Sequence, residues 1–434
     1  MEENEEIREE ESRKAMLTKA PKGTKDILPS EVYKWRYIET CFREIMRRHG
    51  FQEIRTPMFE GTDLFNRGVG ETSDIVNKEM YTFEDRGKRS ITLKPEGTSP
   101  VVRAYIENKE YTLPKPRKYY YITPCFRYER PQAGRLREFH QLGCEIFGAE
   151  GMQADADVIA CADDFLHALG IQDLQLHLNS IGKPRERETY REALRAYFRP
   201  HQSDLCPDCQ DRFDKNPMRL LDCKVKACQA IAAGAPIFLD YLDAESARDF
   251  QELQTKLKAM DIVYTVDPRI VRGLDYYSKT AFEFMSDRIG AQGTICGGGR
   301  YDSLVEEIGG PDIPGVGFGI GIERLLLLME AEQIPIPQEE PADAFLICLG
   351  GPAEQKGLRL AKSLRRKGLA ILMDDLERGL KAQMKGADRS GASYAIIIGE
   401  DELEKGVAVC RDMRRSTQEE VPFDALYARI KEKR

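Results

Sequence analysis

The first clear pattern in the chain is a set of apolar residues at helical spacing close to the N-terminal end. These residues recur mostly three or four positions apart: Trp35, Ile38, Cys41, Phe42, Ile45 and Met46. Gly50 follows them, and glycine is common just beyond the last turn of a helix. The pattern predicts a core-packed helix that ends before Gly50 and an extended segment over residues 51–57.

A long helical and charged stretch interrupts a region of strand-like patterns. Residues 183–260 have helical periodicity and many charged side chains, whereas residues 177–180 before them and 263–266 after them look like strands. We therefore predict a helical insertion at about 183–260 inside a sheet-based domain that covers residues 20–334.

A short proline-rich segment separates this domain from a differently patterned C-terminal region. Residues 335–341 contain three prolines and no helical or strand periodicity, as an interdomain linker does. Beyond them, apolar runs alternate with helical stretches, which predicts a small α/β domain over residues 342–434. The apolar runs are 345–349, 370–373, 394–398 and 407–410, and the helical stretches lie near 354–367, 381–390 and 424–433.

Composition indicates an ordinary globular protein of more than one domain. The chain has 434 residues, 41% of them apolar and 32% charged, and this length exceeds what one hydrophobic core usually serves. No apolar run approaches the roughly 18–20 residues of a membrane span. Residues 1–19 form an acidic N-terminal arm, unlike a secretory signal. Eleven cysteines, an odd number without an export signal, predict free thiols and a cytoplasmic protein.

The charge of the chain limits how it can engage nucleic acid. A net charge of -8 argues against a protein that coats nucleic acid nonspecifically, although it leaves room for local basic surfaces. The region 342–434 is mildly positive within this acidic whole, as a domain that contacts RNA phosphates would be.

Two predicted strands joined by a basic loop carry the first candidate for chemistry. In the segment 125–145, Arg127 and Glu129 share one face of the first strand, and four arginines gather around the turn. One face of the second strand carries Phe139, Gln141, Gly143 and Glu145. A polar strand face can be merely solvated, but arginine binds phosphate in a bidentate fork, so this arrangement favours an anionic ligand.

A second candidate is a run in which glycines alternate with apolar residues before a helical stretch. The glycines are Gly315, Gly317, Gly319 and Gly321, and Arg324 falls in the first helical turn. Glycine on one strand face lets a flat ligand approach the backbone, and the arginine adds to the positive end of the helix dipole. The glycines alone fit a tight contact between a helix and a sheet equally well.

These two segments resemble motifs 2 and 3 of the class II aminoacyl-tRNA synthetases, and residues 42–60 are similar to their motif 1, a dimer interface. The runs 272–277 (RGLDYY) and 297–302 (GGGRYD) resemble signatures of the histidine-specific members, and residues 93–98 are similar to their loop that holds the substrate's amino group. The resemblance covers residues 20–330. It implies an α/β (α+β) fold with an antiparallel-sheet catalytic domain, a helical insertion and a C-terminal α/β anticodon-binding domain.

The resemblance also implies a histidine-binding site. The residues that it assigns are Glu96, Gly97, Thr98, Gln141, Glu145, Tyr276, Tyr277 and Tyr301. It implies that Glu145 accepts from one imidazole nitrogen and that Tyr277 serves the other, while Glu96, Thr98 and Gln141 hold the α-amino group. Neutral imidazole offers one N–H donor and one acceptor nitrogen, so such a pair suits it. A site of this kind can reject isosteres by roughly 10⁴–10⁵ without an editing domain.

The implied reaction activates L-histidine with ATP, accompanied by Mg²⁺, and transfers it to the 3′ end of histidine tRNA. The ATP-binding residues assigned by the resemblance are Arg127, Glu129, Arg135 and Arg324, and the catalytic residues are Arg127, Arg272 and Arg324. Arg127 and Arg272 would bind the α-phosphate, and Glu129 the adenine amino group. Arg135 and Arg324 would face the leaving pyrophosphate. The implied partners are histidine tRNA, L-histidine, ATP and a second copy of the chain, with no membrane.

Four of the cysteines are a weak candidate for a zinc site: Cys206, Cys209, Cys223 and Cys228. Two pairs of cysteines suit a four-thiolate site, but the spacing of the second pair is irregular. Two interpretations stay open, and reduced thiols packed inside the helical insertion are favoured over a structural zinc ion.

Two other functions compete with aminoacylation by histidine. A synthetase-like regulatory subunit of ATP phosphoribosyltransferase keeps the fold without the reaction, but it lacks the anticodon-binding domain and usually loses the active-site arginines. This chain has both. A class II synthetase for another amino acid, such as proline or threonine, is opposed by the run 272–277.

Overall fold

The computed structural model describes residues 19–432 except 71–72, 74, 222, 224, 271–275, 290–292 and 339. The chain divides into two units, Met1–Pro337 and Gln338–Arg434. The predicted acidic arm at residues 1–19 lies outside the described residues, apart from Lys19. Among the described helices, none combines the length and the apolar character needed to cross a lipid bilayer.

An eight-stranded sheet forms the centre of the first unit. In spatial order its strands are β1 (Gln52–Glu53), β5 (Arg117–Phe126), β6 (Glu138–Phe147), β11 (Gly315–Gly321), β10 (Thr294–Tyr301), β9 (Ser278–Met285), β7 (Gln175–Ser180) and β8 (Thr265–Val266). The six central strands pair antiparallel, and only the short edge strands β1 and β8 pair in parallel. The predicted fold class, with its antiparallel catalytic sheet, is therefore confirmed.

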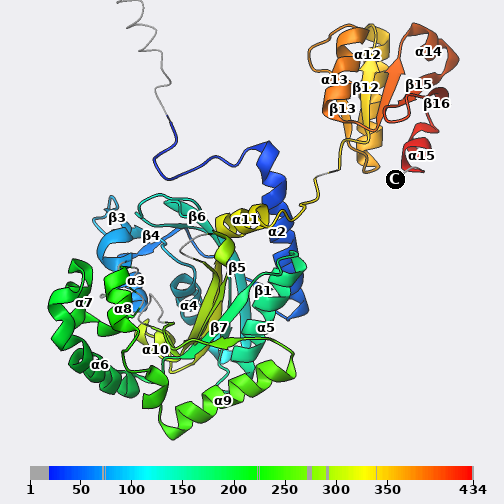
Figure 1. Cartoon of the computed structure of the whole chain (residues 1–434). Coiled ribbons are helices and arrows are strands. Elements are labelled where there is room, and N and C mark those ends of the chain that lie inside the picture. Colours follow the sequence, from blue (N-terminus) through cyan, green and yellow to red (C-terminus); the bar gives the residue numbers. More distant parts are fainter. Residues whose placement is uncertain are drawn as a thin grey trace, which may run out of the picture. The chain divides into compact units, whose positions relative to one another are not determined.

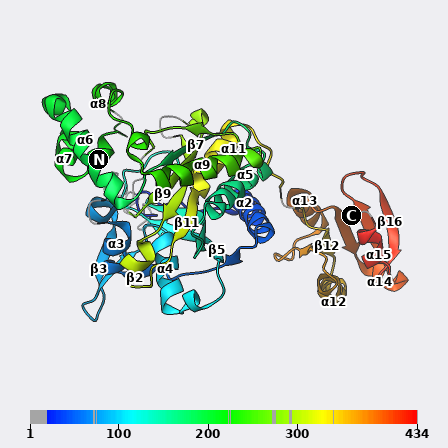
Figure 2. The ribbon, with the colours of Figure 1, turned by 90° about the horizontal axis from the view of Figure 1, so that it is seen from below.

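Four helices cover one face of this sheet and bury a large apolar core against it. They are α2 (Pro29–Arg48), α5 (Gln153–Ala168), α9 (Ala244–Ala259) and α11 (Ile322–Ala331), and Figures 1 and 2 show α5 and α9 side by side. The apolar stripe predicted for α2 is buried at Ile38, Phe42, Ile45 and Met46. Gly50 follows with φ +77°, a conformation that glycine adopts at little cost.

Shorter elements cover the other face. They are α3 (Thr62–Val69), the π-helix η1 (Ile75–Glu79), α4 (Thr98–Glu107), the 3-10 helix η2 (Glu110–Thr112), α10 (Leu304–Glu307) and a small sheet of β2 (Phe59–Gly61), β4 (Ser90–Leu93) and β3 (Tyr81–Glu84). The core between α4, α10 and the sheet is rich in tyrosine, including Tyr105, Tyr121 and Tyr301. This face combines buried hydroxyl groups with apolar walls, as a binding site for a small polar molecule requires.

The predicted insertion is helical but serves two cores. The helices α6 (Pro184–Phe198), α7 (Pro207–Lys215) and α8 (Lys226–Ala232) and the 3-10 helices η3 (Arg199–Asp204), η4 (Pro217–Leu220) and η5 (Phe238–Tyr241) share a small core of their own. Both figures show α6, α7 and α8 together, in green. The last helix, α9, instead packs Phe250, Leu253 and Leu257 into the large apolar core of the sheet. We call residues 184–241 the inserted module.

The second unit is a five-stranded sheet with helices. In spatial order its strands are β13 (Ile371–Met373), β12 (Ala344–Cys348), β14 (Tyr394–Ile398), β15 (Val407–Asp412) and β16 (Gln418–Pro422), and its helices are α12 (Gly351–Arg366), α13 (Leu380–Ser390), α14 (Glu400–Lys405) and α15 (Leu426–Lys431). The four apolar runs of the sequence are all strands. The sequence analysis missed β16, because this edge strand buries only Val421 and has no apolar run.

Candidate active site

Three elements bring hydroxyl groups onto one buried carboxyl group of a fourth element. Glu145 of β6 is 1% exposed. Its Oε1 accepts hydrogen bonds from Thr98 Oγ1 at 2.8 Å and from the Tyr121 hydroxyl at 3.1 Å. Its Oε2 accepts a hydrogen bond from the Tyr301 hydroxyl. Glu145 is thus the centre of a polar cluster built by β5, β6, β10 and the start of α4.

The protonation of Glu145 depends on what occupies this cluster. Burial raises the pKa of Glu145 from its usual value of 4.5 to about 8, and the nearby Glu96 carboxyl contributes to the rise. Hydrogen bonds from Tyr301, Thr98 and Tyr121 favour the ionised form but do not outweigh burial. A ligand that presents an N–H group or a positive charge would therefore stabilise the carboxylate and draw Glu145 into its ionised form.

A second carboxyl group and an amide lie beside this cluster. Glu96 is 2% exposed, and its oxygens accept the backbone N–H groups of Thr98 and Ser99, each at 2.7 Å. Gln141 Oε1 accepts the backbone N–H of Gly97 at 2.9 Å. The two side chains therefore fix the turn before α4 and leave two acceptor groups next to Thr98, where an ammonium group could bind.

Three tyrosines form the apolar side of the cluster. The rings of Tyr276 and Tyr277 lie 4.6 Å apart between centroids, and the ring of Tyr276 lies 5.6 Å from that of Tyr301. All three are buried, and burial raises the pKa of Tyr276 and of Tyr301, so their hydroxyl groups stay protonated. The backbone carbonyl of Tyr277 accepts a hydrogen bond from Arg187 of the inserted module.

The space over the β11 glycines is already occupied by cluster side chains. A Cβ at Gly317 would overlap the Glu145 carboxyl group, and a Cβ at Gly315 would overlap the Tyr301 ring. The sequence analysis expected these glycines to admit a flat ligand to the backbone. In this structure they instead admit the side chains of the binding cluster, so substitution by any larger residue would displace the cluster itself.

The arginines predicted to bind ATP gather around the loop between β5 and β6. Arg127 donates from Nε to the Pro95 carbonyl at 2.8 Å, and its guanidinium lies 5.2 Å from the Phe139 ring centre. Arg135 Nη1 lies 3.2 Å from Glu129 Oε2. Burial, followed by the nearby positive charge of Arg135, lowers the pKa of Arg324. Converging positive charges of this kind favour a polyanionic ligand.

The strand predicted to carry Arg127 and Glu129 ends earlier than expected. β5 closes at Phe126, so both residues lie in the loop, and the prediction that they share a strand face is wrong. The ladder persists for one residue, since the Arg127 N–H bonds to the Arg137 carbonyl at 2.9 Å. The next N–H, of Tyr128, donates to the Glu79 carbonyl of η1 at 2.7 Å instead of continuing the ladder with β6.

The structure thus collects most of the predicted site residues on one face, but not all of them can be placed. Eight of them lie in or beside the carboxyl cluster: Glu96, Gly97, Thr98, Gln141, Glu145, Tyr276, Tyr277 and Tyr301. Four more lie around the loop between β5 and β6: Arg127, Glu129, Arg135 and Arg324. Arg272 lies outside the described residues.

Two residues of this region were missed or left without a role. Tyr121 pairs with Gly143 across the β5–β6 ladder. Strand parity would have placed it on the ligand face, but the predicted strand began at residue 125, after Tyr121. Arg300 of the GGGRYD run is fully buried and forms an ion pair with Asp155 of α5. It ties the sheet to α5 on the face away from Tyr301.

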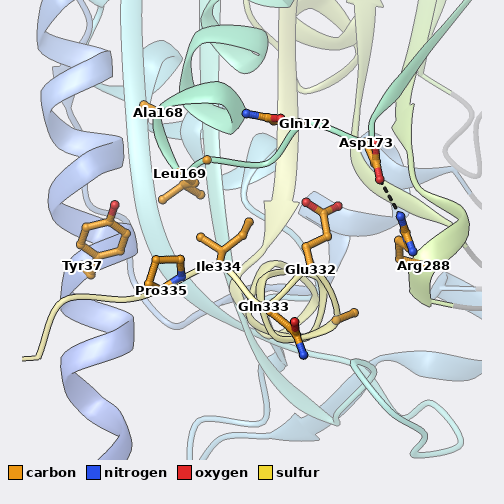
Figure 3. Close-up of a pocket in the computed structure, with 12 residues that line it drawn as sticks. Tyr37, Ala168, Leu169, Gln172, Asp173, Arg288, Glu332, Gln333, Ile334 and Pro335 are labelled. Carbon is orange, nitrogen blue, oxygen red and sulfur yellow. Dashed lines mark hydrogen bonds and ion pairs between the residues drawn. The ribbon is translucent and has the colours of Figure 1, made fainter.

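A separate surface hollow of about 700 Å³ lies away from these residues (Figure 3). Tyr37, Leu169 and Ile334 are among its lining side chains, and an ion pair of 2.8 Å joins Asp173 to Arg288 at its edge. It contains none of the predicted site residues, so we do not assign the substrates to it.

The four cysteines that are candidates for zinc also converge. The Sγ atoms of Cys206, Cys209, Cys223 and Cys228 all lie within 4.8 Å of one another in the inserted module. Among the described residues, these four thiols form a cluster that could hold a metal ion.

Comparison with protein families gives two matches. A family model described as histidyl-tRNA synthetase matches residues 23–199 and 210–325, and a model described as anticodon binding domain matches residues 343–433. The first match passes over residues 200–209, which include Cys206 and Cys209.

Similar proteins match almost the entire chain. The histidine–tRNA ligase of Caldanaerobacter subterraneus subsp. tengcongensis is 54% identical over 416 residues, which are 96% of this chain and 100% of that relative. That of Thermoanaerobacter pseudethanolicus is 55% identical over the same shares of both chains. The crystal structure of apo histidyl-tRNA synthetase from S. aureus is 42% identical with a TM-score of 0.82, covering 96% of this chain and all of that one.

Proposed function

The chain belongs to the histidyl-tRNA synthetase family, and from this premise we propose how its residues perform the reaction. It activates L-histidine with ATP and attaches the histidine to its tRNA, as a histidine–tRNA ligase. The observation that supports the site assignment most strongly is Glu145, buried beneath three hydroxyl donors and beside two further acceptor groups.

We propose that Glu145 recognises the imidazole ring of histidine. Its carboxylate would accept the ring N–H group, and Tyr277 would serve the other ring nitrogen while Tyr276 and Tyr301 form the walls. The raised pKa of Glu145 makes the pocket costly to ionise when empty, and a bound N–H donor offsets this cost. An amino acid without such a donor would leave the buried carboxylate with only its three hydroxyl donors and without the donor that offsets its ionisation, which is the basis for rejecting it.

The amino group of histidine would bind on the α4 side of the cluster. Glu96 and Gln141 each hold an oxygen beside the Gly97–Thr98 turn, and the Thr98 hydroxyl lies between these groups and Glu145. We propose that the ammonium group binds among Glu96, Thr98 and Gln141. This orients the substrate carboxylate toward the arginines.

We propose that ATP binds along the arginine-rich loop as its magnesium complex. Arg127 would contact the α-phosphate, Glu129 the adenine amino group, and Arg135 and Arg324 the β- and γ-phosphates. By resemblance Arg272 would join Arg127 at the α-phosphate. Mg²⁺ would be supplied as the complex with ATP, since it prefers hard oxygen ligands such as those of a triphosphate, and it would neutralise part of the phosphate charge.

The reaction then needs no covalent intermediate with the protein. The histidine carboxylate attacks the α-phosphorus in line, the bond to the pyrophosphate oxygen breaks, and pyrophosphate leaves. A ribose hydroxyl at the 3′ end of the tRNA then attacks the carbonyl carbon of the adenylate, releasing AMP. The protein contributes positioning and fixed positive charge where negative charge develops on phosphate oxygens.

The remaining partners are also proposals. We propose that the second unit binds the anticodon region of histidine tRNA and that the protein acts in the cytoplasm. We further propose a homodimer formed through residues 42–60, in which Met58 and Phe59 are 42% and 56% exposed in the single chain. Apolar side chains exposed next to each other are suited to burial against a second copy.

The regulatory-subunit alternative is less supported than the synthetase. The relatives named as ligases match the chain over nearly its full length, and the anticodon-binding model matches residues 343–433. The substrate-binding arginines Arg127, Arg135 and Arg324 are also present.

Histidine-dependent ATP–pyrophosphate exchange in a matched pair of tyrosine variants tests the proposed pocket. Tyr301→Phe removes a hydroxyl group that donates to Glu145, and the loss of a hydrogen bond to a charged group should raise the KM for histidine roughly 10–100-fold. Tyr105→Phe is the control, because Tyr105 is buried in the same core and its hydroxyl has no hydrogen-bond partner among the described residues. Equal effects of the two substitutions would contradict the assignment of Glu145 to the substrate.

A further inference from the structure

The four cysteines of the inserted module come from three parts of it that the fold brings together. Cys206 immediately precedes α7 and Cys209 lies in its first turn, Cys223 follows η4, and Cys228 lies in α8. All four sulfurs fall within 4.8 Å of one another, and Cys209, Cys223 and Cys228 are buried. Residues 17 positions apart, such as Cys206 and Cys223, meet here only because of the tertiary fold.

The spacing of the sulfurs fits ligands around one tetrahedral ion rather than disulfide bonds. Four thiolates at the Zn–S distance of about 2.3 Å place neighbouring sulfurs roughly 3.8 Å apart. Cys206 Sγ and Cys223 Sγ are separated by 3.8 Å. A disulfide would need about 2.05 Å and would join the sulfurs only in pairs, and all four cysteines are free.

Backbone N–H groups point at two of the sulfurs. The Cys206 N–H donates to Cys228 Sγ at 3.2 Å, and the Val225 N–H donates to Cys223 Sγ at 3.5 Å. Such donors stabilise the thiolate form and orient metal ligands from outside the coordination shell. The position of Cys206 and Cys209 at the N-terminal end of α7 also favours negative charge on their sulfurs.

The small size of the inserted module is a physical reason for a metal ion that stabilises it. Its separate core is small, and three of the buried residues are the cysteines themselves. Compact units of this size commonly need a metal, disulfides or an assembly partner to be stable. No disulfide joins the described cysteines, so a metal ion bound by the four thiols is the cross-link that could stabilise the module.

We propose that Cys206, Cys209, Cys223 and Cys228 bind one structural zinc ion. Four thiolates complete a tetrahedral shell and leave no open position for a substrate, so the ion stabilises the module and takes no part in the aminoacylation chemistry. The irregular spacing of the cysteines in the sequence favoured reduced thiols over a zinc ion. The geometry of the four sulfurs favours the zinc ion instead. The proposal does not rest on the assigned histidine and ATP contacts.

Elemental analysis of the untagged full-length protein tests this directly. We expect about one zinc per chain after gel filtration, lost in Cys206→Ser and in Cys228→Ser. Cys41→Ser is the matched control, because Cys41 is a partly exposed thiol on α2 outside the cluster, and this variant should keep its zinc.

A second measurement avoids any dependence on how the variants fold. Wild-type protein in which cobalt(II) replaces the zinc should show strong thiolate-to-cobalt charge transfer and the intense visible bands of a tetrahedral site. Wild-type protein that neither carries zinc nor retains it after incubation with zinc chloride would overturn the proposal. Zinc that persists in the double variant Cys206→Ser/Cys228→Ser, or iron in place of zinc, would overturn it equally.

Discussion

Replacing Glu145 by glutamine should make the protein without substrates more stable at alkaline pH. The pKa of Glu145 is raised from 4.5 to about 8 in the folded chain, mainly because of burial. The folded state therefore binds this proton more tightly than the unfolded state. Stability is lost as the pH rises from about 4.5 to about 8, and the full cost remains above that range. Glutamine keeps the shape and never ionises.

The size of the effect follows from the width of that pH window. Each pH unit between the two pKa values costs about 1.4 kcal/mol for one group, so wild type should lose roughly 4 kcal/mol relative to Glu145→Gln between about pH 5 and about pH 8. This is an upper bound, because the buried site can relax or admit water when the carboxyl group ionises. The group is 1% exposed, so solvent screening does not reduce the figure further.

Chemical unfolding of both proteins over this pH range, without histidine or ATP, measures the difference. Glu150→Gln is the control, since Glu150 is exposed just after β6 and its substitution should leave the pH dependence unchanged. Glu145→Gln should also lose most histidine activation, because an amide offers the imidazole N–H a weaker acceptor than a carboxylate does. Parallel stability curves for wild type and Glu145→Gln would refute the argument that burial controls this group.

Three further predictions concern other parts of the chain. Arg324→Ala should slow single-turnover adenylate formation by about 10²–10³ while transfer from supplied adenylate to tRNA suffers much less; equal losses in both steps would count against its assigned role. His49 bonds to Asp157 and Asp164, which raises its pKa to about 9, so its stabilisation is present below about pH 6.5 and lost as the pH rises through about 9. Thermal unfolding should therefore show His49→Gln to be destabilised at about pH 6 and little changed at about pH 10, and a uniform loss would contradict this. A chain that ends at Pro337 should retain pyrophosphate exchange and lose most tRNA charging, and intact charging at limiting tRNA would disprove the role of the second unit.

Patterns with a fixed period were predictable from the sequence. The apolar stripe of α2 is buried as predicted, and Gln141 and Glu145 of β6 both reach the carboxyl cluster as their shared strand face predicts, because helix and strand geometry dictate which residues lie together. The glycine run was placed as β11 leading into α11, and four strands of the second unit were located by their apolar runs. These features depend on local sequence alone.

Features that depend on tertiary contacts were not predictable in the same way. Just beyond the end of β5 the Tyr128 N–H bonds to Glu79 of η1 rather than to β6, and the contribution of Tyr121 depends on its register against Gly143. The cysteine spacing gave no clear metal pattern, because the η4 turn and α8 determine where Cys223 and Cys228 lie. The polar edge strand β16 is specified by its pairing with β15 rather than by its own pattern.

The central claim is that this chain charges histidine tRNA and uses the Glu145 cluster to select histidine. The most direct measurement is aminoacylation of total tRNA by the purified full-length protein, with ATP and each amino acid supplied in labelled form in turn. We predict that histidine alone is esterified, and that Glu145→Gln loses this reaction while Glu150→Gln retains it. Charging with another amino acid, or full histidine charging by Glu145→Gln, would contradict the account.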